Sequence, residues 1–283
     1  MLLRPKYSLN ELLDHVEELR VFPDVAVRVN EVIRKPGTGI REMSSAVSMD
    51  PVLSGRLLKV ANSPFYGLPR PASSVERAVQ IIGFHSTRDL ALALAMSGMG
   101  SGRTEEAAEV WTHTLYTAVA MRHMARYVRG LDRDEAFITG LMHDLGVLIL
   151  LSVEAEAYVP LHHSFSSQGA LLARAEQVQF GFDHAALGAA CLQRWRLADG
   201  IVAAVAGHHQ DCLPEVARRS KVLAALHVAS DLVRAVGRGG EDQAAQVGAV
   251  HPLSATLRIP QAAWGIIAHA IVEDGDEMIE MMS

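Results

Sequence analysis

The sequence predicts an all-α protein, because helix-forming patterns recur along the whole chain and strand patterns are nearly absent. Apolar residues repeat at the three- and four-residue spacing that places them on one face of a helix. Capping residues precede several of these runs, as in Ser8-Leu9-Asn10-Glu11 and in the pair Asp50-Pro51. Glycines and prolines stand between the runs, where helices are expected to end.

The N-terminal block is expected to contain a series of short helices. The Ser8 capping box opens a helix through about Arg20, and Pro23 stands in the first turn of the next, which ends at Lys35-Pro36-Gly37. The proline-rich segment 64–71 is expected to be irregular. Further helices are expected at 40–47, 52–60, 75–83 and 90–96.

Longer helices are expected beyond the glycine-rich residues 98–102. They cover residues 105–128, 132–152, 154–162, 169–179, 184–195, 199–208 and 215–236. A loose segment at 237–243 and an amphipathic helix from Pro260 complete the chain. We therefore expect an N-terminal helical part at 1–104, a helical core at 105–236, and a linker with a C-terminal helix at 237–283.

Bulk composition excludes several classes of protein. The 283 residues are 49% hydrophobic and 20% charged, which is typical of a globular chain with a sizeable core. The 26 basic and 32 acidic residues give a net charge of −6 and form no basic run, so we expect no direct binding of nucleic acid.

Neither a membrane segment nor a leader is expected. No uninterrupted apolar stretch of about 18 residues occurs, and the N-terminus lacks the apolar region of a signal peptide. Cys191 and Cys212 form no disulfide framework, which is typical of a reducing compartment. We predict a cytoplasmic protein that does not bind membranes.

His143 and Asp144 stand in an otherwise apolar run from Gly140 to Leu151. Burying an imidazole beside a carboxylate is costly unless each group is hydrogen-bonded or coordinates an ion. Two interpretations are open at this point: a hydrogen bond between the two side chains inside a core, or a metal site.

Further metal-capable side chains follow one another in the same part of the chain. Glu109 and His113 share one helix face, since they are four residues apart. The others are His184, His208, His209 and Asp231. Neutral imidazole and carboxylate groups suit divalent Fe, Mn, Zn or Ni, and this set is large enough for two ions.

The remaining histidines are interpreted as residues of surfaces and helix ends, because a chain with 13 histidines will scatter some of them there. They are His15, His85, His123, His162, His163, His227, His251 and His269.

The ordered series resembles the HD superfamily of metal-dependent phosphohydrolases, which is named after a His-Asp doublet like His143-Asp144. The resemblance implies core metal ligands at His113, His143, Asp144 and Asp231. It also implies additional ligands, as in the binuclear HD-GYP phosphodiesterases of cyclic dinucleotides, at His184, His208, His209 and Glu109. In such sites the metal ions activate a water nucleophile and neutralise phosphoryl oxygens.

Two positions depart from the HD-GYP pattern. Val147 stands where those enzymes place a lysine that meets phosphate, and the Gly-Tyr-Pro signature is absent after His208-His209. The pattern therefore allows metal ligands to persist without the phosphate-binding cation.

Other segments resemble the HDOD domain, an HD-related regulatory module. They include Phe22-Pro23-Asp24-Val25-Ala26, Asp50-Pro51-Val52-Leu53, residues 57–63, Tyr66-Gly67, residues 74–78, Gly83, and residues 180–184, 192–195 and 208–209. The resemblance spans about residues 13 to 236. It implies an N-terminal helical part packed against an HD-like helical core, in bacterial signalling proteins that usually lack demonstrated catalysis.

Two functions remain open from the sequence. The first is a regulatory module with signalling proteins as partners, in which Phe65 and Tyr66 form a recognition patch or are ordinary packing residues. The second is a metal-dependent phosphohydrolase with a nucleotide or cyclic dinucleotide as its ligand. Both interpretations include a site for divalent metal, and the sequence leaves open whether the protein is an enzyme.

Overall fold

The computed structural model describes residues 7–18, 28–29, 31–32, 35, 37–63, 66, 68–100, 104–210 and 220–282. Regular structure within these residues is entirely α-helical, so the predicted fold class is confirmed. Most of the helix predicted after Pro23 lies outside the described residues, as do Phe65 and Cys212.

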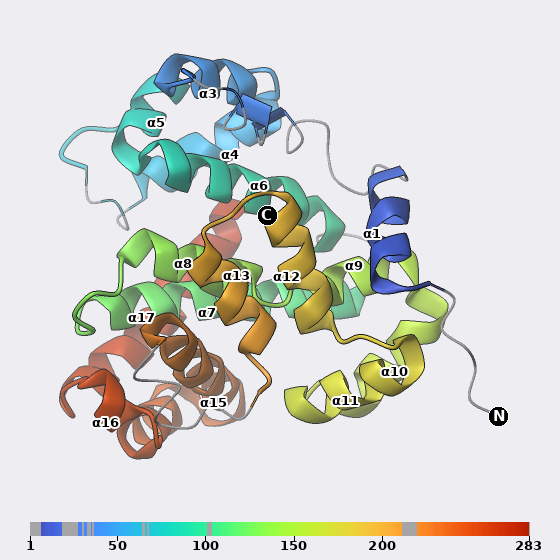
Figure 1. The fold of residues 1–283 in the computed structure, drawn as a ribbon. Coiled ribbons are helices and arrows are strands. Elements are labelled where there is room, and N and C mark those ends of the chain that lie inside the picture. Colours follow the sequence, from blue (N-terminus) through green and yellow to red (C-terminus); the bar gives the residue numbers. More distant parts are fainter. Residues whose placement is uncertain are drawn as a thin grey trace.

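The N-terminal part of the chain forms several helices, most of which lie at one end of the molecule (Figure 1). They are α1 (Leu9–Glu18), α3 (Ile40–Ser48), α4 (Pro51–Asn62), α5 (Val75–Ile82) and α6 (Phe84–Gly100). Their starts follow the capping residues: Ser8 and Glu11 exchange backbone-to-side-chain hydrogen bonds, and the Asp50 carboxylate accepts from the first amides of α4. In Figure 1, α3, α4 and α5 cluster together, while α1 lies apart from them beside α12.

The remaining helices form the larger part of the molecule. They are α7 (Glu105–Ala125), α8 (Arg133–Met142), α9 (Leu145–Val153), α10 (Ala155–Phe165), α11 (Gly169–Phe180), α12 (His184–Arg194), α13 (Asp199–Gly207), α15 (Lys221–Val250), α16 (Ser254–Leu257) and α17 (Ala263–Met282). Helix α7 lies against α8, α15 and α17, so it forms the centre of this part.

Residues 98–100 and 237–243, which belong to two glycine-rich segments, are parts of helices. Helix α6 continues to Gly100, and α15 continues through residues 237–243 to Val250. The predicted linker is reduced to a kink in α15, at Gly239 and at Gly240, where φ is 73°. A positive φ of this kind is readily adopted only by glycine, which explains why the composition suggested a linker there.

Two hydrophobic cores divide α7 along its length, the first taking its residues up to Val119 and the second those from Ala120 onward. The first joins N-terminal residues such as Leu57 and Leu90 to Leu148 of α9 and Leu192 of α12. The second packs α7 against α15, α16 and α17, with Trp264 near its centre. The N-terminal helices are thus packed against the helical core through shared apolar residues, while the boundary near residue 104 stays a prediction.

The stretch Arg133–Val153, which covers α8 and α9, is long and apolar enough to cross a membrane by length and composition alone. Its most apolar window is 83% buried inside the protein, as in the core helix of a globular domain. We therefore interpret it as a core element that presents His143 and Asp144 to the interior.

Candidate metal centre

His143 and Asp144 lie at a break between α8 and α9. The sequence predicted one helix over residues 132–152, but Asp144 leaves helical geometry with φ −99° and ψ 20°. Adjacent side chains on a continuous helix point about 100° apart. At the break the two side chains instead meet, with the His143 Nε2 atom 3.1 Å from Asp144 Oδ2.

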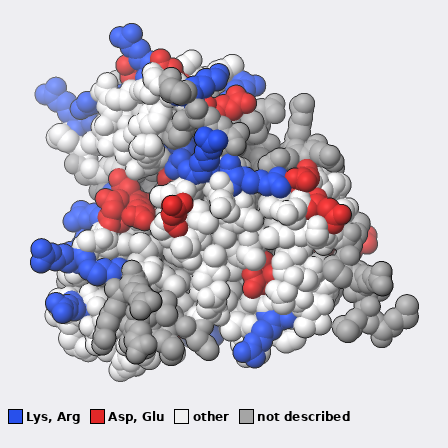
Figure 2. Space-filling view, in the orientation of Figure 1, with Lys and Arg blue, Asp and Glu red and all other residues white. Residues whose placement is uncertain are grey.

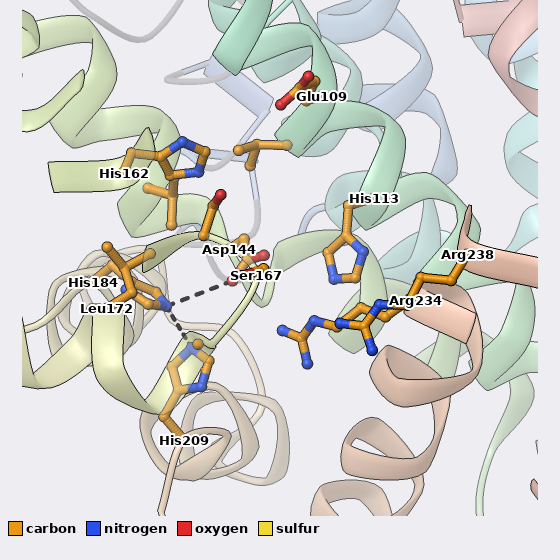
Figure 3. A pocket seen from close by; sticks show the side chains of 14 residues that line it. Glu109, His113, Asp144, His162, Ser167, Leu172, His184, His209, Arg234 and Arg238 are labelled. Carbon is orange, nitrogen blue, oxygen red and sulfur yellow. Dashed lines mark hydrogen bonds and ion pairs between the residues drawn. The ribbon is translucent and has the colours of Figure 1, made fainter. Parts of the chain in front are cut away.

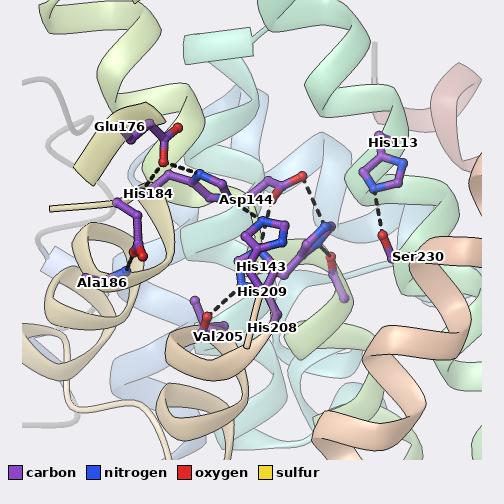
Figure 4. A network of polar contacts seen from close by, with 12 residues as sticks. His113, His143, Asp144, Glu176, His184, Ala186, Val205, His208, His209 and Ser230 are labelled. Carbon is purple, nitrogen blue, oxygen red and sulfur yellow. Dashed lines mark hydrogen bonds and ion pairs between the residues drawn. The ribbon is translucent and has the colours of Figure 1, made fainter. Parts of the chain in front are cut away.

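The Asp144 carboxylate is shared by two groups of possible metal ligands (Figure 4). In the first group its Oδ1 atom lies 3.4 Å from His208 Nε2 and 3.6 Å from His184 Nε2. His209 completes this group, while His113, His143 and Asp144 form the second. The ligand atoms within each group lie within 4.8 Å of one another, which is the separation expected around a common ion.

Backbone carbonyls orient two of these imidazoles. The Nδ1–H group of His143 donates to the Gly140 carbonyl at 2.7 Å, and that of His208 donates to the Val205 carbonyl at 2.6 Å. Both Nε2 atoms therefore carry a lone pair that faces the cluster. Each Nε2 atom faces an Asp144 oxygen, at 3.1 Å for His143 and 3.4 Å for His208, but neither forms a hydrogen bond among the described residues, and a metal ion there would take both lone pairs.

Burial sets the protonation state of most of the cluster. It is the largest influence that lowers the pKa of His208 and His209, and it lowers the pKa of His113 to about 3. Burial alone would raise the pKa of Asp144, but the adjacent imidazoles, His143 foremost, hold that pKa well below its ordinary value. Neutral imidazoles around an ionised carboxylate are the forms that coordinate metal.

Glu176 orients His184 and was not predicted as a site residue. Its fully buried carboxylate accepts from the backbone N–H of His184 at 2.8 Å and from the ring Nδ1–H at 2.6 Å. The Tyr158 hydroxyl donates to its other oxygen. The available signal was the position of Glu176 on the apolar face that carries Leu172 and Phe180, where a carboxylate needs a partner.

His184 differs from its neighbours because burial, which lowers its pKa, is outweighed by the charge and hydrogen bond of Glu176, so that the pKa is raised. Its Nε2 atom lies 2.7 Å from His209 Nε2. Two nitrogens this close must share a proton, which we assign to His184 as donor. A metal ion in this group would take the place of that proton.

A cavity of about 280 Å³ opens onto the cluster (Figure 3). Asp144, His113, His184 and His209 line it, together with Val147. Glu109 also lines it but is exposed, and it belongs to neither group of ligand atoms.

His162 lies in the last turn of α10, as its assignment to helix ends and surfaces allowed, but its side chain lines this cavity instead of facing solvent. Its side chain is buried and its Nδ1 atom has no hydrogen-bond partner among the described residues. The sequence offered only the weak signal that His162 ends an apolar helix run, which is also the usual place for a solvated histidine.

Asp231 does not join the other predicted ligands. Its carboxylate is about half exposed and lies 3.3 Å from both His251 Nε2 and Arg234. The preceding residue, Ser230, faces the cluster, with its hydroxyl 3.4 Å from His113 Nε2. Successive positions on α15 point in different directions, so only one of the two can reach His113.

Tyr66, predicted as part of a recognition patch, lies at the junction of the N-terminal helices and α7. The Arg122 guanidinium stands 4.9 Å from the centre of its ring and donates to Asp134 at 2.7 Å. Burial raises the pKa of Tyr66 to about 12. These contacts favour a packing role, and partner binding by Tyr66 stays a prediction; Phe65 lies outside the described residues.

An all-helical fold that places a His-Asp doublet among further histidines defines the class of HD-type proteins. Within this class the chain belongs to the HDOD domain family, which matches residues 19–211. A curated relative, an uncharacterised protein of Treponema pallidum (strain Nichols), is 22% identical over 214 residues. That alignment covers 75% of this chain and 41% of the relative, so the chain spans less than half of that protein's length.

Two solved structures share the fold. One, from Shewanella amazonensis SB2B and named as a candidate phosphohydrolase, has a TM-score of 0.72, is 23% identical, and matches 96% of this chain and 98% of its own. The other, from Marinobacter aquaeolei VT8 and named as a candidate signal transduction protein, has a TM-score of 0.64, is 20% identical, and matches 92% of this chain and 58% of its own.

Proposed function

We propose that the protein is a regulatory HDOD module of bacterial signal transduction that retains an HD-type site for divalent metal. One observation carries this proposal: the buried Nε2 atoms of His143 and His208 face the two oxygens of the Asp144 carboxylate without forming a hydrogen bond among the described residues. Because the Nδ1–H groups of both rings donate to backbone carbonyls, both Nε2 lone pairs point at a carboxylate, an arrangement that a coordinated ion stabilises.

The two ligand groups are expected to differ in their affinity for metal. Asp144, His184, His208 and His209 offer four ligand atoms, which is enough for a complete tetrahedral site. The group around His113 offers three, with the neutral Ser230 hydroxyl where a carboxylate would be stronger. We infer that the four-ligand group fills first, with Fe, Mn, Zn or Ni, and that a second ion binds more weakly beside His113.

A signalling role fits the rest of the cavity and the surface. Val147 gives no cation next to the doublet, and the N-terminal helices contribute no ligand atom among their described residues. On the face shown in Figure 2, acidic and basic side chains are interspersed, which suits a protein partner better than a phosphate backbone. The Marinobacter aquaeolei relative is likewise named for signal transduction.

Metal analysis of the purified protein tests the proposal. We expect at least one equivalent of divalent metal per chain, because the four-ligand group is preformed, and we expect His184→Ala and His208→Ala to lose most of it. His269→Ala is the matched control, since that ring is exposed on α17. A folded wild-type protein that binds none of the four metals, even when they are added in excess, would contradict the proposal.

A second candidate function is metal-dependent hydrolysis of a nucleotide or cyclic dinucleotide, favoured by the cavity that leads from solvent to Asp144. Bound metal would supply an activated water and neutralise phosphoryl oxygens. The chain itself would hold the ions through its imidazoles and admit substrate past Glu109. Turnover of a nucleotide panel by the metal-loaded protein, abolished in Asp144→Asn, would establish this function, and its absence would favour the regulatory role alone.

A further inference from the structure

Two arginines line the wall of the metal-centre cavity that is formed by α15. Arg234 and Arg238 are one helical turn apart, and Figure 3 shows both guanidinium groups directed toward the cavity that also contains His113 and Asp144. They were not predicted, because two arginines four residues apart on a helix are usually a solvated face. Their position matters because Val147 leaves the doublet without its phosphate-binding cation.

The start of α11 closes the cavity next to these arginines. Ser166, Ser167 and Gly169 line it, and a Cβ atom at Gly169 would lie 2.3 Å from the His209 ring and 3.3 Å from the Arg234 guanidinium. The Gln168 side chain makes no capping hydrogen bond and its carbonyl accepts from the Leu171 and Leu172 amides, so the Gly169 and Ala170 amides are left for another acceptor. Backbone donors, a guanidinium and the histidine cluster therefore meet within a few ångströms.

The charges around the cavity are unbalanced once metal is present. Its carboxylates are Asp144 and Glu109, and its cations are Arg234 and Arg238, so one or two divalent ions would leave an excess of positive charge. Arg234 has one partner, Asp231 at 3.3 Å, and Arg238 has no ion pair among the described residues. The buried His162 adds an Nδ1 atom that lacks a hydrogen-bond partner there.

We propose that Arg234, Arg238 and the start of α11 bind a phosphoryl group, whose remaining oxygens reach the metal at Asp144. The site supplies cations from α15 in a cavity where Val147 supplies none, with the bidentate geometry that guanidinium groups offer to phosphate. The ligand class is a phosphate monoester or free phosphate. This inference rests on the proposed metal site, because the metal supplies the charge that makes the cavity attractive to a dianion.

Isothermal titration with inorganic phosphate and with a nucleoside monophosphate tests the site, using metal-loaded and chelator-treated protein. We expect saturable binding to the loaded protein and weaker binding after chelation. Arg234→Gln and Arg238→Gln are each expected to weaken binding by about ten- to a hundredfold, because each removes a charge-assisted hydrogen-bonding group. Tighter binding of the monophosphate would identify an ester as the ligand, and equal binding would identify free phosphate.

The matched control is Arg174→Gln, which removes the same charge from the exposed face of α11 and is expected to bind phosphate like the wild type. Metal content and thermal melting of each variant verify that the fold and the metal centre are intact. Unchanged phosphate binding in both cavity variants, or an equal loss in Arg174→Gln, would overturn the proposal. If the wild type binds phosphate through these arginines but holds no metal, the metal site fails and the phosphate site stands.

Discussion

At the scale of single residues, two buried carboxylates have different roles in the metal centre. Asp144 lies between the two ligand groups, while Glu176 stands behind His184 and fixes its ring through two hydrogen bonds. A carboxylate behind a histidine ligand raises the basicity of that ligand and holds its orientation. The raised pKa of His184 is the consequence of this arrangement that an experiment can measure.

The first residue-scale prediction concerns Glu176→Gln. We expect metal affinity at alkaline pH to fall by about 10- to 100-fold, because the ring loses its charged partner. In the wild type a proton on His184 competes with metal, so affinity should fall as pH falls through the raised pKa. In the variant that pKa is no longer raised, so the loss of affinity should begin at lower pH.

Metal titrations between pH 5 and pH 9 measure both effects. Glu156→Gln, an exposed position on α10, provides the control for loss of one carboxylate. An unchanged pH profile in Glu176→Gln would show that Glu176 supports the fold without tuning the ligand.

At the scale of secondary structure, two glycines set the position of the helix break. A Cβ atom at Gly140 would lie 2.6 Å from the Ala118 backbone of α7, and one at Gly146 would lie 2.0 Å from the His184 carbonyl of α12. Helix α8 is thereby held against α7 and α9 against α12. The doublet between them is positioned by contacts on both sides.

We therefore expect Gly146→Ala to displace α12 and with it His184. Overpacking against backbone should destabilise the fold by about 3 kcal/mol or more and reduce metal content. Gly265→Ala on α17, where no atom lies within 4 Å of the new methyl group, should be neutral or stabilising by up to about 1 kcal/mol. Denaturant melts with metal analysis measure both, and equal stabilities would contradict the inferred role of Gly146.

Helices were predicted well from sequence, whereas their interruptions were not. The capping groups of Ser8 and Asp50 are local signals, so α1 and α4 begin where expected. The break at Asp144 depends on the packing of α12 against Gly146, which is a contact between distant segments. The periodicity of apolar residues in a sequence carries no information about contacts between distant segments.

At the scale of the whole molecule, the metal centre lies where several helices converge. Its candidate ligands come from α7, from the break between α8 and α9, from α12, and from the turn after α13. An ion bound there links segments that are distant in sequence. Because unfolding would separate these ligands, binding should stabilise the folded state.

Removal of metal should therefore lower the melting temperature. At a free metal concentration 100-fold above the dissociation constant, binding contributes about 2.7 kcal/mol, or about 5–10 °C for a chain of this size. Calorimetry with and without chelator measures the shift, and His208→Ala, which removes a ligand of the four-ligand group, should show almost none of it. A wild-type melting temperature that is indifferent to chelator and to added metal would argue against a bound ion.

The candidate site could be predicted from sequence where residue type alone identifies a metal ligand. The doublet and the histidines at 113, 184, 208 and 209 lie together in the structure. The sequence does not show which way neighbouring side chains on α15 point. Asp231 was therefore predicted as a metal ligand, although it is Ser230 that faces His113. His162, Arg234 and Arg238 became site residues only through the cavity that the packed helices form.

The unpartnered Nε2 atoms of His143 and His208 also bear on how this family diverges. Two buried imidazole nitrogens that lack a hydrogen bond among the described residues and face a carboxylate destabilise the fold once no ion is held, so selection should not preserve them in that state. A lineage that abandons the metal is expected to drift at these positions toward small or apolar residues. A descendant that retains both histidines is then expected still to bind the ion.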